Sequence, residues 1–179
     1  MLQTRTVPSL SRAIPTLLQV VGGALFLALL AQVKIPLGFT PVPLSFQTLA
    51  VMLVTIFLGP KRGPSAVSLY LLIGACGFPV LAGGASGASH FFGATGGYLL
   101  GFLVQSLLIS RLVKLTHSNV RIFLTLLLTS FAQLGLGVLW LGQFVGFKNV
   151  LFLGFFPFIL GDLFKILAVT AYCEKKKAS

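Results

Sequence analysis

The sequence contains almost no acidic residues. Asp162 and Glu174 are the only two among 179 residues. This scarcity excludes the paired carboxylates of acid–base catalysis and an acidic cluster for a divalent metal ion. A proton relay across a membrane usually uses several titratable residues, so that function is disfavoured as well.

Cysteine and histidine are also scarce, with two of each. Cys76 and Cys173 lie far apart in apolar segments, and we interpret both as small buried apolar side chains. His90 and His117 have no partner at metal-ligand spacing, and neither adjoins a plausible nucleophile. The sequence also has no G-x-x-x-x-G-K-[ST] phosphate loop. We therefore expect no catalytic residues, no metal and no resident cofactor, and any ATP hydrolysis would belong to another subunit.

Charged residues make up only 8% of the chain, hydrophobic residues make up 56%, and the mean hydropathy is +1.03. These values indicate an integral membrane protein, because average soluble domains carry about a quarter charged residues. The net charge of +11 comes from basic residues scattered between apolar runs. They form no basic face interleaved with aromatics, so we expect contact with membrane lipid and not with nucleic acid.

Apolar runs separated by Gly, Pro and charge predict an all-α fold with six transmembrane helices in a single domain over residues 1–179. Short tails are expected at about 1–13 and 173–179. The second and third spans, divided by "GPKRGP", are short for a full crossing. The predicted spans are 14–33, 43–59, 64–79, 95–113, 121–142 and 150–172.

Lysine and arginine alternate between the segments that connect these spans. Ten lie in one set of segments, only Lys34 and Lys148 lie in the other, and Lys165 lies inside the last span. The positive-inside rule then places both termini in the cytoplasm and predicts a multi-pass protein of the cytoplasmic (inner) membrane. The ten are Arg5, Arg12, Lys61, Arg62, Arg111, Lys114, Arg121, Lys175, Lys176 and Lys177.

The outer connections, at 34–43, 80–97 and 142–149, are unlike the short basic inner ones. The first is stiffened by three prolines, and the second is rich in glycine, which permits tight turns and close approach to a ligand. Glycine-rich loops are often only flexible connections, so this feature alone does not establish a binding site.

Asp162 and Lys165 stand in the apolar stretch "FILGDLFKIL". A charge at the bilayer centre costs about 2.5–3.5 kcal/mol or more, so such residues normally face the protein interior. Residues three apart share one helix face. The pair is interpreted either as a mutually neutralising ion pair that joins helices, or as a clamp for a polar ligand.

Small residues form a strip in the first span, where Ala24 and Ala28 are four residues apart. Such a strip allows another helix to approach closely. Internal packing and docking of a partner membrane protein are both compatible with it.

Several stretches together resemble the BioY family, the biotin-binding S components of energy-coupling-factor (ECF) transporters. They are "QVKIPLGFTPVPLSFQTLAVMLV", "LGPKRGPSAVSLYLLIGACGFPVLAGG", "GATGGYLLGF", "GVLWL" and "GDLFKIL". The resemblance implies an S-component-like bundle that captures biotin from outside. It also implies partners, namely an ECF transmembrane coupling protein and two ABC-type ATPases.

The resemblance also implies substrate-binding residues. Asp162 would bind the ureido N–H of biotin, Lys165 a ligand oxygen, and Tyr98 would pack on the bicyclic ring and donate its hydroxyl. The first-loop motif would cover the ligand. Trp140 would either contact the ligand or have a role in structural packing. The remaining implied site residues are Phe39, Thr40, Pro41, Val42, Gly83 and Gly84.

The second outer loop departs from the family pattern, since Ala94 stands where relatives commonly have proline. The stretch "ASGASH" (85–90) is also less rich in glycine and more polar than the family pattern, so the polar contacts that relatives make from this loop cannot be assigned residue by residue here. Three alternatives to a biotin S component remain: a solitary biotin or vitamin carrier, an S component for a different small vitamin, and a structural or assembly membrane protein.

Overall fold

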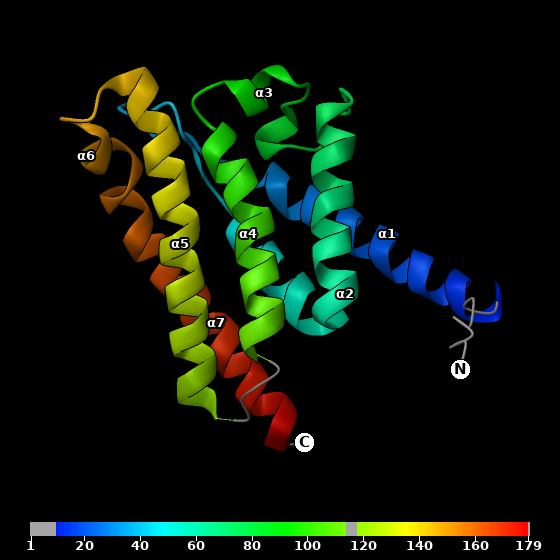
Figure 1. Cartoon of the computed structure of the whole chain (residues 1–179). Helices are drawn as coiled ribbons and strands as arrows, with labels where there is room; N and C mark the ends of the chain where they lie inside the picture. The colour runs from blue at the N-terminus through cyan, green and yellow to red at the C-terminus, as the bar shows by residue number, and fades with distance from the viewer. Residues whose placement is uncertain (1–9, 114–117, 179) are drawn as a thin grey trace, which may run out of the picture.

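The computed structural model describes residues 10–113 and 118–178, and most of these are helical (Figure 1). The main helices are α1 (Leu10–Gln32), α2 (Gln47–Ala75), α4 (Gly96–Leu112), α5 (Asn119–Val145) and α7 (Phe156–Ala178). The connections hold strands β1 (Lys34–Ile35) and β2 (Leu44–Ser45), a 3₁₀ turn η1 (Ala82–Gly84), and helices α3 (Ser89–Phe92) and α6 (Val150–Gly154).

Three helical stretches in the described ranges are long and apolar enough to cross a membrane. Helix α4 is apolar but shorter. The protein is therefore mainly helical and membrane-embedded, as the composition predicted. The three stretches are Ile14–Gln32, Asn119–Val145 and Val150–Lys175.

Helix α2 is a hairpin of two helical halves. The chain reverses at Gly59, whose φ of +77° favours glycine, and Pro60 follows directly. Gln47, near the start of α2, donates a hydrogen bond of 2.6 Å to the Tyr70 hydroxyl near its end. The halves correspond to the predicted spans 43–59 and 64–79.

The predicted start of the second span at residue 43 was four residues too early. Residues 44–45 form β2, which pairs antiparallel with β1. The ladder holds Leu44 and Ser45 extended against Ile35 and Lys34, so these residues cannot join the helix. The helix therefore begins only at Gln47.

The last predicted span, 150–172, is broken near its start. Helix α6 ends at Gly154, Phe155 has non-helical dihedrals (φ −121°, ψ −65°), and α7 begins at Phe156. Pro157 has no N–H to donate to the carbonyl of Leu153, so a continuous helix would lose a hydrogen bond here. At its other end α7 continues to Ala178, through residues that were expected to form a tail.

Three clusters of buried apolar residues hold the helices together. One joins α1, α2 and α4 and includes Leu27, Val67 and Leu99. A second joins α2, α4, α5 and α7 around Met52 and Leu126. The third lies beneath the loops at the opposite end from the C-terminus, where α3 and α6 are also found (Figure 1).

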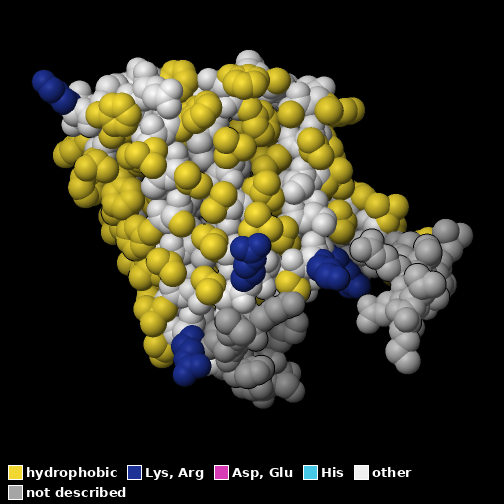
Figure 2. All heavy atoms as spheres, viewed as in Figure 1, with side chains coloured by type: hydrophobic (Ala, Val, Ile, Leu, Met, Phe, Trp, Pro, Cys, Tyr) yellow, Lys and Arg dark blue, Asp and Glu magenta, His cyan; other side chains and the backbone are white. Residues whose placement is uncertain are grey.

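The exterior is largely apolar. Hydrophobic side chains cover much of the face in Figure 2, whereas Lys and Arg side chains lie mainly in the lower half of that view, toward the C-terminal end, with one at the upper left. An apolar belt with polar ends is the surface that a lipid bilayer requires. Large exposed side chains in the belt include Leu17, Leu29, Leu128, Leu139, Leu160 and Phe164.

We predict that Gly63→Ala lowers the thermal unfolding midpoint of the purified protein. A Cβ at Gly63 would stand 2.7 Å from the Thr55 Cα in the other half of α2, and overpacking of this kind costs about 1–3 kcal/mol. Gly22→Ala is the matched control, because nothing lies within 4 Å of its Cβ position. Equal midpoints for both variants would contradict the tight hairpin.

Candidate functional site

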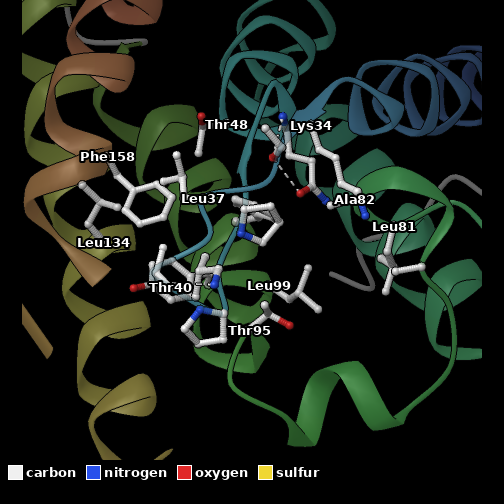
Figure 3. Close-up of a pocket in the computed structure, with 18 of the residues that line it drawn as sticks. Lys34, Leu37, Thr40, Thr48, Leu81, Ala82, Thr95, Leu99, Leu134 and Phe158 are labelled. Carbon is white, nitrogen blue, oxygen red and sulfur yellow. Dashed lines mark hydrogen bonds between the residues drawn. The ribbon is translucent and has the colours of Figure 1, made fainter. Parts of the chain in front are cut away.

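A cavity of about 320 Å³ lies among the helix ends opposite the C-terminus (Figure 1 and Figure 3). Its walls come from the first loop (residues 33–46), the second loop (residues 76–95) and helices α2, α4, α5 and α7. The size suits a small organic ligand. Most of the lining is apolar, including Leu37, Val42, Leu99, Phe102, Leu134 and Phe158.

The floor of the cavity holds Asp162 and Lys165. Both residues are buried, with 4% and 8% of their surface exposed, respectively. Lys165 Nζ and Asp162 Oδ1 form an ion pair of 3.1 Å. Lys165 Nζ also donates to Thr48 Oγ1 at 2.7 Å and to the Ser45 carbonyl at 2.8 Å. All three ammonium donors are therefore used within the protein.

Thr48 bridges the two charges. Its hydroxyl accepts from Lys165 and donates to Asp162 Oδ1 at 3.1 Å. Helix α7 is thereby tied to the first turn of α2 and to β2. The burial of a charged pair is tolerable here because hydrogen bonds satisfy it on several sides.

Two buried acceptors at the cavity have no partner among the described residues. They are Asp162 Oδ2 and Gln133 Oε1, and both residues line the cavity. An unsatisfied buried polar group costs about 1–3 kcal/mol, so each acceptor favours an incoming donor. The floor can therefore bind a ligand that presents N–H groups.

The first loop contributes much of the wall. Thr40, Pro41 and Val42 line the cavity, and Val42 is buried. The Val42 N–H donates to Thr40 Oγ1 at 3.3 Å, which folds this segment into a compact turn. Phe39 is 60% exposed and is not part of the lining.

The second loop forms the opposite wall through Leu81, Ala82 and Ala85. Gly83 and Gly84 lie between these residues but outside the lining. The Lys34 side chain occupies the place that a Cβ on Gly83 would take. The two loops are therefore in direct contact.

Tyr98 lines the cavity and is 5% exposed, and its ring centroid lies 6.0 Å from that of Phe158. Its hydroxyl, which was expected to donate to the ligand, donates to the Gly154 carbonyl at 2.8 Å. That carbonyl lies at the break between α6 and α7, so the hydroxyl stabilises the break.

Trp140 and the small-residue strip lie outside the cavity. Trp140 Nε1 donates to the Gly93 carbonyl at 2.9 Å, and its side chain packs against Gly97, which fits the packing alternative. Ala24 is 3% exposed in the core with α2, and Ala28 is partly buried beside it. Docking of a partner at the strip stays a prediction.

The sequence reasoning did not assign several polar residues that line the cavity. Gln47 and Thr48 stand in the quoted "PLSFQT" block but received no role, and Gln133 is a single amide in an apolar span. A search for isolated polar residues within spans would have found Gln133. The other unassigned polar lining residues are Lys34, Ser45, His90 and Thr95.

Comparison with known proteins then identifies the family. A family model described as BioY family matches residues 4–179. The chain belongs to the BioY family. The resemblance drawn from the sequence motifs is thereby confirmed.

Individual members are similar over most of their length. Biotin transporter BioY2 of Lactococcus lactis subsp. cremoris is 40% identical, covering 84% of this chain and 83% of that protein. The probable biotin transporter BioY of Pyrococcus horikoshii is 37% identical, covering 85% and 91%. The crystal structure of the S-component for biotin from an ECF-type ABC transporter superposes with a TM-score of 0.80 at 25% identity, covering 97% of this chain and 96% of that one.

We predict that Thr48→Val lowers the thermal unfolding midpoint. Valine keeps the shape but removes one of the three acceptors of Lys165 and one of the two donors to Asp162 Oδ1, a loss of about 1–3 kcal/mol. Thr129→Val is the matched control, since buried Thr129 bonds only the Leu126 carbonyl of its own helix. An unchanged midpoint for Thr48→Val would show that the bridge adds no stability.

Proposed function

We propose that this protein takes up biotin, as a membrane-embedded substrate-binding S component that captures the vitamin from the outer side. The observation that carries the proposal is the polar floor of an otherwise apolar cavity, with a buried Asp162–Lys165 pair and two free acceptors. The relatives named biotin transporters, and the structural neighbour named as an S-component for biotin, support this choice of ligand.

The chemistry of biotin fits the floor. Its ureido ring carries two N–H donors, which suit Asp162 Oδ2 and Gln133 Oε1. Its apolar thioether ring suits Phe158, Leu134 and the ring of Tyr98. Lys165 donates to the ureido oxygen when one of its three present acceptors is exchanged for the ligand.

We further propose six membrane crossings with both termini in the cytoplasm. Helix α1, the two halves of α2, α4, α5 and the α6–α7 segment supply six helical passages in chain order. The ten-to-two distribution of basic residues supports the cytoplasmic placement of the termini. The cavity then lies on the outer side of the cytoplasmic membrane.

Energy for uptake would come from partner subunits, an ECF transmembrane coupling protein and two ABC-type ATPases. The likeness to a component of an ECF-type ABC transporter supports this assembly. The sequence has no phosphate-binding loop of its own.

We predict that Asp162→Asn weakens biotin binding by about 1.5–3 kcal/mol, or roughly 10- to 150-fold. Asp162 Oδ1 is held by Lys165 and Thr48, so the amide NH₂ would replace Oδ2 and face the ligand N–H. Equilibrium binding of labelled biotin to purified protein measures the effect.

Glu174→Gln is the matched control, because Glu174 is the only other acidic residue and is exposed. If Asp162→Asn does not fold, Asp162→Asn/Lys165→Gln removes the pair without leaving a single buried charge. Unchanged affinity in these variants would contradict the clamp. A panel of vitamins in the same assay tests whether the protein binds a different vitamin more tightly than biotin. If the protein has only a structural role, biotin should not raise its thermal unfolding midpoint.

We predict that Ala28→Leu abolishes uptake in cells while purified protein still binds biotin, if α1 docks to a coupling protein. Ala28 is partly exposed and therefore tests docking better than Ala24, which lies in the core. Ala171→Leu on α7 is the control, since Ala171 is also exposed. Normal uptake by Ala28→Leu would count against docking, and uptake that persists without any ECF module would favour a solitary carrier.

A further inference from the structure

We infer that Lys34 is a specificity residue that binds the carboxylate of the ligand at the mouth of the cavity. The inference rests on the proposed function, because it assigns one end of an anionic vitamin to one side chain. Lys34 was counted in the sequence only as a basic residue of an outer loop.

The fold holds Lys34 in a defined place. Lys34 belongs to β1 and pairs across the ladder with Ser45 of β2. The carbonyl of Ser45 accepts a hydrogen bond from Lys165. Lys34 is therefore connected through one strand pair to the polar floor, and its own side chain contributes to the cavity wall.

The side chain of Lys34 extends from the first loop toward Ala82 of the second loop (Figure 3). Its Cδ, Cε and Nζ atoms pack where a Cβ on Gly83 would stand. Gly83 has a φ of +64°, so glycine suits both the backbone and the close approach of Lys34. The ammonium is thus positioned against the second loop beside the cavity.

The charge at the cavity is unbalanced. Its lining contains Lys34, Lys165 and Asp162, and the last two neutralise each other in the ion pair. In the part of the chain that the structure describes, no hydrogen bond or ion pair engages the Lys34 ammonium. One positive charge therefore remains for a ligand anion, and Lys34 is exposed where such an anion would enter.

The two lysines thus have separate tasks. Lys165 is buried and its three donors are taken, whereas Lys34 is exposed and keeps its donors for the ligand. A ligand with N–H donors at one end and a carboxylate at the other would satisfy both ends of the cavity. The contact between the Lys34 ammonium and the ligand carboxylate would then favour the anionic ligand over uncharged analogues.

The test measures equilibrium binding of biotin and of its neutral primary amide to purified wild-type protein and three variants. We expect Lys34→Gln to weaken biotin binding about 5- to 30-fold, because it removes one charged hydrogen bond whose strength is reduced by solvent exposure. Amide binding should change less than about twofold, and Lys34→Arg should retain most of the biotin affinity. Lys148 is the other exposed lysine of the outer loops and lies outside the cavity lining. Lys148→Gln should therefore leave the binding affinities for biotin and for the amide unchanged.

Ionic strength gives a second readout without a variant. Added salt should weaken wild-type binding of biotin more than binding of the amide, because exposed charges are screened. Equal losses for biotin and amide in Lys34→Gln, or no loss for either, would overturn the inference while leaving biotin binding itself intact. A wild-type protein that binds neither ligand would instead remove the proposed function, and this inference with it.

Discussion

The ion pair between Asp162 and Lys165 is the interaction on which the cavity depends. Each charge would be costly within an apolar helix, and their mutual attraction alone does not repay the loss of water. Thr48 and the Ser45 carbonyl supply the missing hydrogen bonds from the start of α2 and from β2. The pair therefore fixes the first loop against α7, and that loop forms a wall of the cavity.

Within the described ranges, the hydrogen-bond network around the pair leaves acceptors, and not donors, without partners. Lys165 is fully bonded and Asp162 Oδ1 has two donors, but Asp162 Oδ2 and Gln133 Oε1, in two residues that line the cavity, are buried without partners among the described residues. Packing for stability alone would have satisfied or removed these acceptors, since each costs free energy in the empty protein. Local departures from good packing are expected at functional sites, where a ligand supplies what the fold leaves out.

Hydropathy and charge predicted the helical passages and singled out the pair, because both are properties of local sequence. They did not predict the partners of the pair, since Thr48 and Asp162 lie 114 residues apart and meet only in the folded chain. They also missed the break at Phe155, where the backbone depends on Pro157 and on the Tyr98 hydroxyl from another helix. Motif resemblance placed Tyr98 and Val42 at the cavity, but it could not separate them from Phe39 and Trp140, whose positions depend on side-chain packing.

The contrast between Lys34 and Lys165 shows how one residue type acquires two roles. At the floor, burial demands a counter-charge, so Lys165 is neutralised and the floor selects hydrogen bonds over charge. At the mouth, water stabilises an unpaired ammonium, so Lys34 needs no partner in the empty protein and can attract an anion. A ligand with an uncharged N–H head and an anionic tail would then bind in one orientation, head to the floor. The reversed orientation would place a carboxylate at the end of the cavity that holds Asp162, which like charge and desolvation both oppose.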